Sequence, residues 1–68
     1  MKKTMTVEGM SCGHCTARVE KALNAIGGVQ AEANLQKGEV YVTMENNVED
    51  SVLTGAVEEA GYEVKGIQ

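Results

Sequence analysis

Two cysteines with a histidine between them are the residues of this sequence best suited to chemistry. Both cysteines of the 68-residue chain, and its only histidine, fall in the segment GMSCGHC at residues 9–15. Cys12 and Cys15 are three positions apart, and His14 lies between them. A pair of soft sulfur ligands selects Cu(I), which, unlike Zn(II), does not need four tetrahedral donors. The segment therefore predicts a two-cysteine site for a soft monovalent metal ion.

Three other readings of the cysteine pair stay open. A zinc site needs two further ligands, and only His14 and scattered carboxylates are at hand. The tetrapeptide CGHC is also the active site of protein disulfide isomerases, which are larger and carry a Trp before the first cysteine and a cis-proline facing the pair. Here Ser11 precedes Cys12, and the chain has no Trp and no Pro. In the last reading, the cysteines are simply small buried apolar side chains.

Composition excludes several classes of function. Ten acidic residues stand against six basic ones, which gives a net charge of -4 with no basic run, so nucleic acid is not an expected partner. No apolar run reaches the length of a signal peptide or a membrane span, so we expect no direct membrane insertion and a cytoplasmic location. Cytosolic thiols are kept reduced, which favours a metal-binding or catalytic cysteine pair over a structural disulfide.

The elements around the cysteines follow from the hydrophobic pattern. Residues 2–8 alternate, with Met5 and Val7 on one face, and predict a half-buried strand. After the GMSCGHC segment an apolar stripe at helical spacing predicts a helix that ends at Gly27-Gly28. The stripe consists of Cys15, Val19, Ala22, Leu23 and Ile26.

The start of this helix sets the expected arrangement of the thiols. Ser11 is the predicted N-cap, which puts Cys12 in the first turn, where the helix dipole favours an anion. Cys12 is therefore predicted to be the more acidic thiol. Cys15 continues the buried stripe, so the two sulfurs should face one another across one helical turn, with Cys12 the more exposed.

The second half of the chain repeats this order of strand and helix. Alternation returns from Val29 to Leu35, with Ala31 and Ala33 on the face of Leu35, and again over residues 39–44, which predicts a hairpin. A second helix is predicted with Asn47 as its N-cap, and residues 62–67 form a last strand. Its apolar stripe consists of Val52, Leu53, Ala56, Val57 and Ala60.

The predicted order is β-α-β-β-α-β in an α+β chain. That order fits the ferredoxin-like sandwich, in which a four-stranded antiparallel sheet packs two helices against one face. Each apolar stripe then has a partner. Residues 1–68 are expected to form one domain.

The motifs together resemble the heavy-metal-associated domain over essentially the whole chain, and within that family the bacterial copper chaperones of the CopZ type. They are GMSCGHC and the following helix, then Gly28-Val29, Asn34-Leu35 and Gly61-Tyr62. The resemblance implies the same ferredoxin-like fold. It also implies that Cys12 and Cys15 bind one Cu(I) ion in near-linear geometry at an exposed loop.

The resemblance implies roles for the neighbours of the thiols as well. Met10 should fill the core beneath the loop rather than act as a ligand, and Tyr62 should lie near the loop and shield it. His14 matches a variable position, where it is expected to tune thiol acidity and metal exchange. Ser11 stands where zinc-transport domains often carry an acidic residue.

One departure from the family pattern is visible. The segment between Gly28 and Leu35 is one residue shorter than usual, and Ala31 and Ala33 stand where larger β-branched residues are common. The second strand is therefore expected to pack loosely, and the stability of the fold is expected to depend partly on bound metal.

The function implied by the resemblance is that of a carrier. A copper chaperone would pass Cu(I) by ligand exchange to a similar CxxC domain of a copper-transporting P-type ATPase, with a copper-responsive repressor as a second partner. No substrate is converted, so no enzyme activity is expected. The chain should be monomeric without metal, and copper could bridge two copies. The alternatives are a metal-binding domain excised from such an ATPase and a small dithiol-disulfide oxidoreductase.

Overall fold

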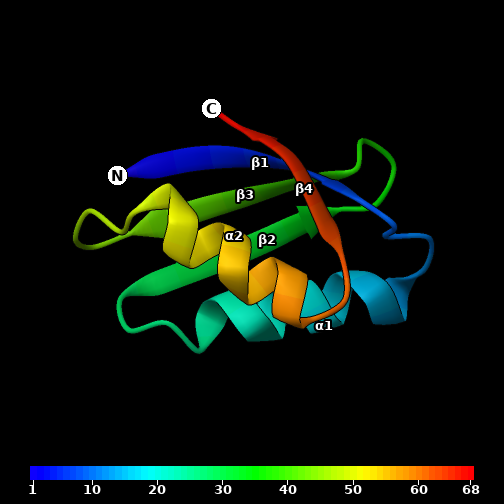
Figure 1. Ribbon diagram of the computed structural model, residues 1–68, viewed down its shortest axis with the longest axis horizontal. Helices are drawn as coiled ribbons and strands as arrows, with labels where there is room; N and C mark the ends of the chain where they lie inside the picture. The colour runs from blue at the N-terminus through cyan, green and yellow to red at the C-terminus, as the bar shows by residue number, and fades with distance from the viewer.

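The computed structural model describes residues 1–68 and has the predicted order of elements (Figure 1). The elements are β1 (Lys2–Glu8), α1 (Gly13–Asn24), β2 (Val29–Asn34), β3 (Glu39–Met44), α2 (Asp50–Glu59) and β4 (Glu63–Ile67). This is the α+β ferredoxin-like fold predicted from the sequence pattern.

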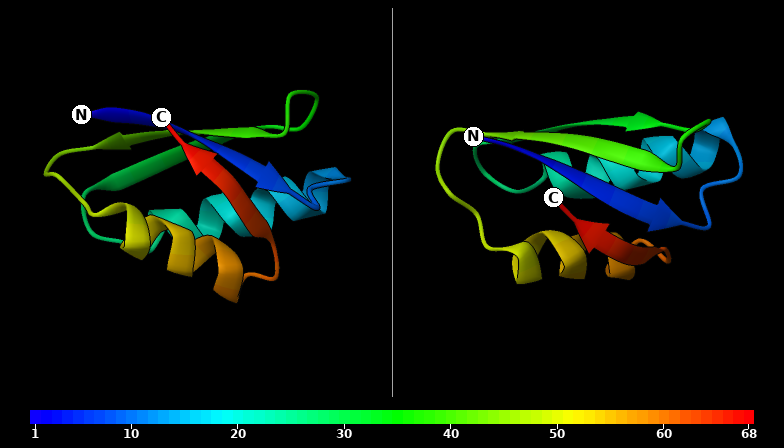
Figure 2. Two further views of the ribbon diagram at one scale, coloured as in Figure 1. Left: turned by 45° about the horizontal axis from the view of Figure 1, so that its top comes forward. Right: turned by 90° about the horizontal axis from the view of Figure 1, so that it is seen from above.

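The four strands form one antiparallel sheet in the order β2-β3-β1-β4. The register pairs Met5 with Val40 and Val42 with Ala31, so the inward-facing residues of neighbouring strands lie side by side. Both helices lie against the same face of the sheet, as Figure 2 shows in two further views. The predicted layering is confirmed.

The core between the sheet and the helices is built from aliphatic and methionine side chains. Eleven residues are buried and none of them is polar. They are Met5, Val7, Met10, Val19, Leu23, Val29, Val40, Val42, Met44, Leu53 and Val57. Each fully buried side chain of this kind contributes about 1.5–3 kcal/mol relative to an exposed one. With no Phe and no Trp in the chain, the flexible methionines fill the larger gaps.

Both helices begin one or two residues later than the predicted caps. Cys12, not Ser11, is the N-cap of α1, and Glu49, not Asn47, is the N-cap of α2. Neither residue makes a capping hydrogen bond through its side chain. At α2, Val48 packs against the core just before the helix, so tertiary packing overrides the capping preference of Asn47.

Two apolar residues lie outside the predicted core. The strand β2 ends at Asn34, so Leu35 is in the turn and is 41% exposed rather than on the face of Ala33. The Asn34 side chain explains the early end, because its Oδ1 accepts a hydrogen bond from the backbone N–H of Lys37 at 3.1 Å and starts the turn. Val52 of α2 is also largely exposed.

The hairpin turn between β2 and β3 packs against the end of β1. The backbone N–H of Val7 donates to the Gly38 carbonyl at 2.8 Å. Gly38 has a φ of +65°, and a Cβ there would lie 3.4 Å from the Val7 carbonyl oxygen, so this close approach suits glycine. The contact places the turn beside the loop that follows β1.

Neither α1 nor α2 has the length and the apolar character that a membrane-spanning helix needs.

Candidate metal centre

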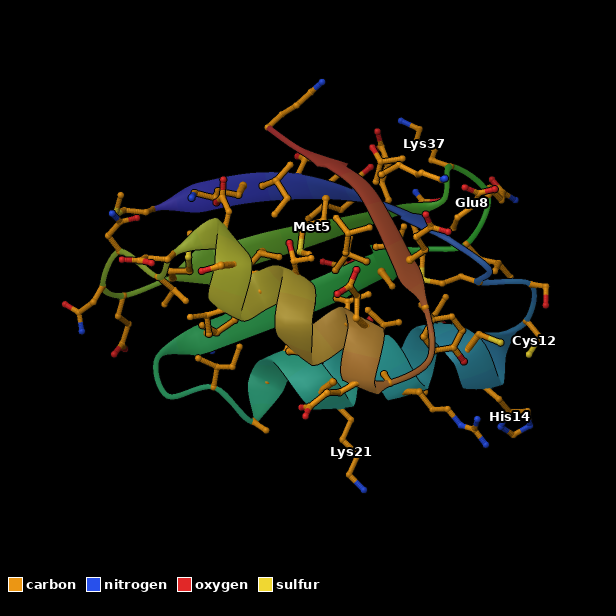
Figure 3. All side chains as sticks on the ribbon, viewed as in Figure 1. Met5, Glu8, Cys12, His14, Lys21 and Lys37 are labelled. Atoms are coloured by element: carbon orange, nitrogen blue, oxygen red, sulfur yellow. The ribbon has the colours of Figure 1, made fainter.

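The two thiols lie together at one end of the molecule. The Sγ atoms of Cys12 and Cys15 are 3.3 Å apart, and both cysteines are free. Cys12 is exposed, and its side chain points away from the body of the protein at the start of α1 (Figure 3). Cys15 is half-buried and packs against the core. The predicted face-to-face arrangement, with one solvent-exposed and one half-buried sulfur, is confirmed.

The loop after β1 fixes this arrangement through its backbone. Gly9 turns the chain with a φ of +98°, a conformation that favours glycine. The Cys12 carbonyl then accepts hydrogen bonds from the backbone N–H groups of Cys15 and Thr16, at 3.0 and 3.3 Å, which starts the helix. The two cysteines therefore belong to the same turn of backbone, and their separation is set by local geometry.

The Cys15 thiol is unusually acidic. Its pKa is lowered from 9.0 to about 6, chiefly by polar contact with the Tyr62 side chain and then by hydrogen bonding to the backbone of Ser11. The Cys12 side chain and backbone lower the pKa further, while partial burial opposes the shift. At neutral pH the inner sulfur is mostly a thiolate, which is the form that binds metal.

The sequence pointed to Cys12 as the more acidic thiol and did not anticipate the lowered pKa of Cys15. As the N-cap, Cys12 makes no capping hydrogen bond through its side chain. The groups that stabilise a thiolate instead surround Cys15, which is reached by the backbone of both Ser11 and Cys12 and by the side chain of Tyr62.

Tyr62 reaches the thiols from the opposite end of the chain. It follows α2, is half-buried and packs against the core. Contact with Cys15 and partial burial raise its pKa, so the hydroxyl stays protonated at neutral pH and can donate to the thiolate. Its ring also covers Gly9, where a Cβ would lie 3.4 Å from Tyr62 Cδ1. The predicted position of Tyr62 near the loop is confirmed.

The other residues named from the motif divide into one buried and two exposed. Met10 is 8% exposed and belongs to the core, as predicted. Ser11 and His14 are exposed, and Figure 3 shows the His14 side chain at the same end of the molecule as Cys12. The imidazole is not among the groups that shift the Cys15 pKa, so the tuning role of His14 stays a prediction.

Arg18 is a neighbour that the motif did not reveal. Its charge and its hydrogen bonding lower the pKa of Tyr62, partly offsetting the effect of Cys15. Arg18 lies three residues after Cys15 on α1, and side chains at this spacing lie on the same face of a helix. The spacing is the sequence signal that could have placed Arg18 near the site. That spacing could not predict the contact of Arg18 with Tyr62, which lies far along the chain.

The arrangement suits a soft ion held by two sulfurs. Neither cysteine lines any of the surface hollows, so the thiols form an open site rather than a pocket. No group of three or more His, Cys, Asp or Glu side chains is placed to share a metal ion. Two close sulfurs, one of them largely ionised, match the ligand preference of Cu(I).

Comparison with known proteins identifies relatives of this chain. The sequence profile described as "Heavy-metal-associated domain" matches residues 4–63. The protein named "Copper chaperone CopZ" of Staphylococcus aureus (strain MRSA252) is 48% identical over 65 residues, which cover 93% of this chain and 96% of that protein.

Solved structures agree with the sequence comparison. A structure described as "CopZ metallochaperone" superposes with a TM-score of 0.89 at 45% identity, over 94% of this chain and 98% of that one. The Cu(I)-loaded N-terminal domain of a potential copper-translocating P-type ATPase from Bacillus subtilis gives a TM-score of 0.84 at 38% identity, over 98% and 89% of the two chains. The chain belongs to the heavy-metal-associated domain family.

Proposed function

We propose that residues 1–68 form a single domain that carries Cu(I) in the cytoplasm and converts no substrate. Cys12 and Cys15 are the proposed ligands. The observation that carries the proposal is the pair of sulfurs 3.3 Å apart, one exposed and one half-buried, with the Cys15 pKa lowered to about 6. Such a site can take up a soft ion at neutral pH without first losing a proton from the inner thiol. The similarity to proteins named as copper chaperones supports the same role.

The different exposure of the two sulfurs suggests how the ion leaves. Copper is the cargo, and an ion held by two sulfurs can accept a third thiolate from a partner. The Cys12–copper bond then breaks first, because Cys12 is exposed at the helix start, while Cys15 is held against the core. The oxidation state of copper does not change, and the departing Cys12 sulfur takes up a proton from water. The ion is never released free in solution.

The partner proposed for this exchange is a metal-binding domain of a copper-transporting P-type ATPase. An N-terminal domain of such a potential ATPase shares the fold and 38% of the residues of this chain, so the two proteins would present similar sites. A copper-responsive repressor is a second proposed partner. A homodimer bridged by copper would use the same exposed loop twice.

The thiol geometry is also compatible with a second function, that of a dithiol oxidoreductase. An acidic cysteine beside a second thiol is also the arrangement of disulfide-exchange enzymes. In this chain, however, Ser11 stands before the first cysteine, where protein disulfide isomerases carry a Trp, and no Pro is present. This mismatch disfavours the oxidoreductase and leaves the carrier as the better-supported function.

Competition with a chromophoric Cu(I) chelator tests the proposal. The reduced protein, kept free of oxygen, should remove about one copper ion per chain from the chelator, and Cys12→Ser/Cys15→Ser should remove none. His14→Ala is the matched control, since His14 lies between the two cysteines, and this variant should still bind. Binding by the double variant as tight as that of the wild type would refute the site. Insulin reduction by the metal-free protein would support the oxidoreductase instead.

A further inference from the structure

The backbone amides on the outer edge of β2 are all paired, two of them with side chains of α1. β2 is an outer strand of the sheet, and such a strand exposes backbone N–H groups that can pair with another chain. In an antiparallel strand alternate amides point outward, and here these are the amides of Val29, Ala31 and Ala33. The Ala31 amide donates to Asn24 Oδ1 and the Ala33 amide to Glu20 Oε2, each at 2.8 Å. The Val29 amide donates to the Ile26 carbonyl at 3.1 Å.

The spacing of the two side chains matches the spacing of the two amides. Glu20 and Asn24 are one turn apart on α1, which is a rise of about 6 Å along the helix axis. Ala31 and Ala33 are two residues apart on β2, a distance of about 6.6 Å along the strand. The two elements run in opposite directions, so Glu20 meets the later amide and Asn24 the earlier one. The helix thus supplies acceptors where a neighbouring strand would supply carbonyls.

The small residues of β2 make this contact possible. Ala31 and Ala33 pair with Val42 and Val40 on one side of the strand, and α1 runs alongside the other (Figure 1). A methyl group at each position leaves room for the helix to approach until two short polar side chains reach the strand. The alanines that depart from the family pattern are therefore the residues that bring α1 to the edge.

Apart from the exposed charge of Glu32, the strand lacks the usual protection against pairing. Outer strands are commonly defended by Lys, by Pro or by a bulge. The sequence of β2, VQAEAN, contains neither Lys nor Pro, and its pairing with β3 is regular over all six residues. The only charged residue is Glu32, which pairs with Tyr41 of β3.

We propose that Glu20 and Asn24 form a latch that keeps β2 from pairing with β2 of a second copy of this chain. Two identical edges related by a two-fold axis can pair in antiparallel fashion, which makes a second copy the natural occupant once the latch is open. The latch keeps the metal-free protein monomeric. It acts at a distance from the thiols, and it does not depend on metal binding.

Glu20→Ala/Asn24→Ala, studied as reduced, metal-free protein, tests this latch. Alanine raises the helix propensity at both positions, so α1 should stay folded while the acceptors are lost. Amide hydrogen exchange measured by NMR in dilute solution should accelerate about two- to tenfold at Ala31 and at Ala33, as expected for the loss of one hydrogen bond each. Sedimentation should show a dimer whose fraction grows with protein concentration, while the wild type stays monomeric.

Matched variants separate the latch from general loosening. Lys21→Ala lies between the two latch residues, its side chain points away from the sheet in Figure 3, and it should leave both measurements unchanged. Glu20→Gln keeps an acceptor oxygen and should restore wild-type exchange at Ala33. If the double variant unfolds, Asn24→Ala alone carries the test through the exchange at Ala31 and the sedimentation. Unchanged exchange at the freed amides, or a folded variant that stays monomeric at all concentrations used, overturns the proposal.

Discussion

The side chain of Tyr62 is the group that most strongly lowers the pKa of the Cys15 thiol. The two residues come from opposite ends of the chain: Cys15 from the first turns of α1, Tyr62 from the turn between α2 and β4. Their contact joins the start of α1 to the turn before β4. It gives the inner thiol a neutral donor rather than a cation, so the thiolate is stabilised and its negative charge is kept for a metal ion.

Tyr62→Phe should raise the pKa of Cys15 from about 6 toward its ordinary value of 9.0. The change removes only the hydroxyl, which is the largest cause of the shift, and leaves the ring over Gly9. The titration can be followed by the ultraviolet absorbance of the thiolate in the reduced, metal-free protein. Tyr41→Phe removes the only other tyrosine hydroxyl, which bonds to Glu39 at 3.0 Å, and should leave the titration as it is. Equal titration curves for the two variants would contradict the assignment.

The lowered pKa of Cys15 also predicts how stability depends on pH. A group whose pKa falls on folding stabilises the native state most above its unfolded pKa, and loses that contribution as the pH drops through its folded pKa. The thermal midpoint of the reduced, metal-free protein should therefore rise between pH 6 and 9, the range between the two pKa values. Cys15→Ser should flatten this part of the profile, and Cys12→Ala should retain a rise. A profile with the same slope in wild type and Cys15→Ser would show that other groups cause it.

Met10→Leu separates the packing role of Met10 from a role as a ligand. Leucine conserves the volume of this buried side chain and removes its sulfur, so stability should change by less than about 1.5 kcal/mol. Copper affinity in the chelator competition should stay within about threefold of the wild type, a change of well under 1.4 kcal/mol. Met10→Ala, by contrast, opens a cavity and should cost about 2–5 kcal/mol in urea denaturation. Loss of copper binding in a stable Met10→Leu protein would make the sulfur a ligand.

Two glycines should respond in opposite directions to alanine. Gly38→Ala forces a φ of +65° on a residue with a Cβ, beside the Val7 carbonyl, and should cost about 1–2 kcal/mol of stability. Gly55 lies inside α2, where an added Cβ meets nothing within 4 Å, so Gly55→Ala should stabilise the protein by about 0.5–1 kcal/mol. Urea denaturation of both variants measures the two changes. The same sign for both would mean that backbone conformation does not control these positions.

Alternation and helical spacing were enough to predict the order of the elements, because each stripe of apolar residues has one partner in a two-layer fold. The helix starts were less predictable. Asn47 is the better N-cap by type, yet packing of Val48 against the core moves the cap to Glu49. Leu35 continues the alternation of β2, but the Asn34 side chain turns the chain before it. Local side-chain bonds and tertiary packing decided both cases.

The candidate site shows the same division between local and distant information. Cys12 and Cys15 are three residues apart, so local backbone geometry sets the distance between their sulfurs, and their proximity was predicted correctly. The lowered pKa of Cys15 was not predicted, because it depends on the Ser11 backbone and on the Tyr62 side chain, which reach this sulfur in the folded chain. The roles of Glu20 and Asn24 at the β2 edge gave no signal in a single sequence, since both are ordinary polar residues of a helix surface.

The contact between Cys15 and Tyr62 ties the reactivity of the thiol to the timing of folding. Because the chain is made from its N-terminus, the cysteines are synthesised well before Tyr62. Until α2 and β4 have docked, the nascent chain carries a thiol without its main source of acidity. The full acidity of the Cys15 thiol therefore marks a chain in which α2 and β4 have docked.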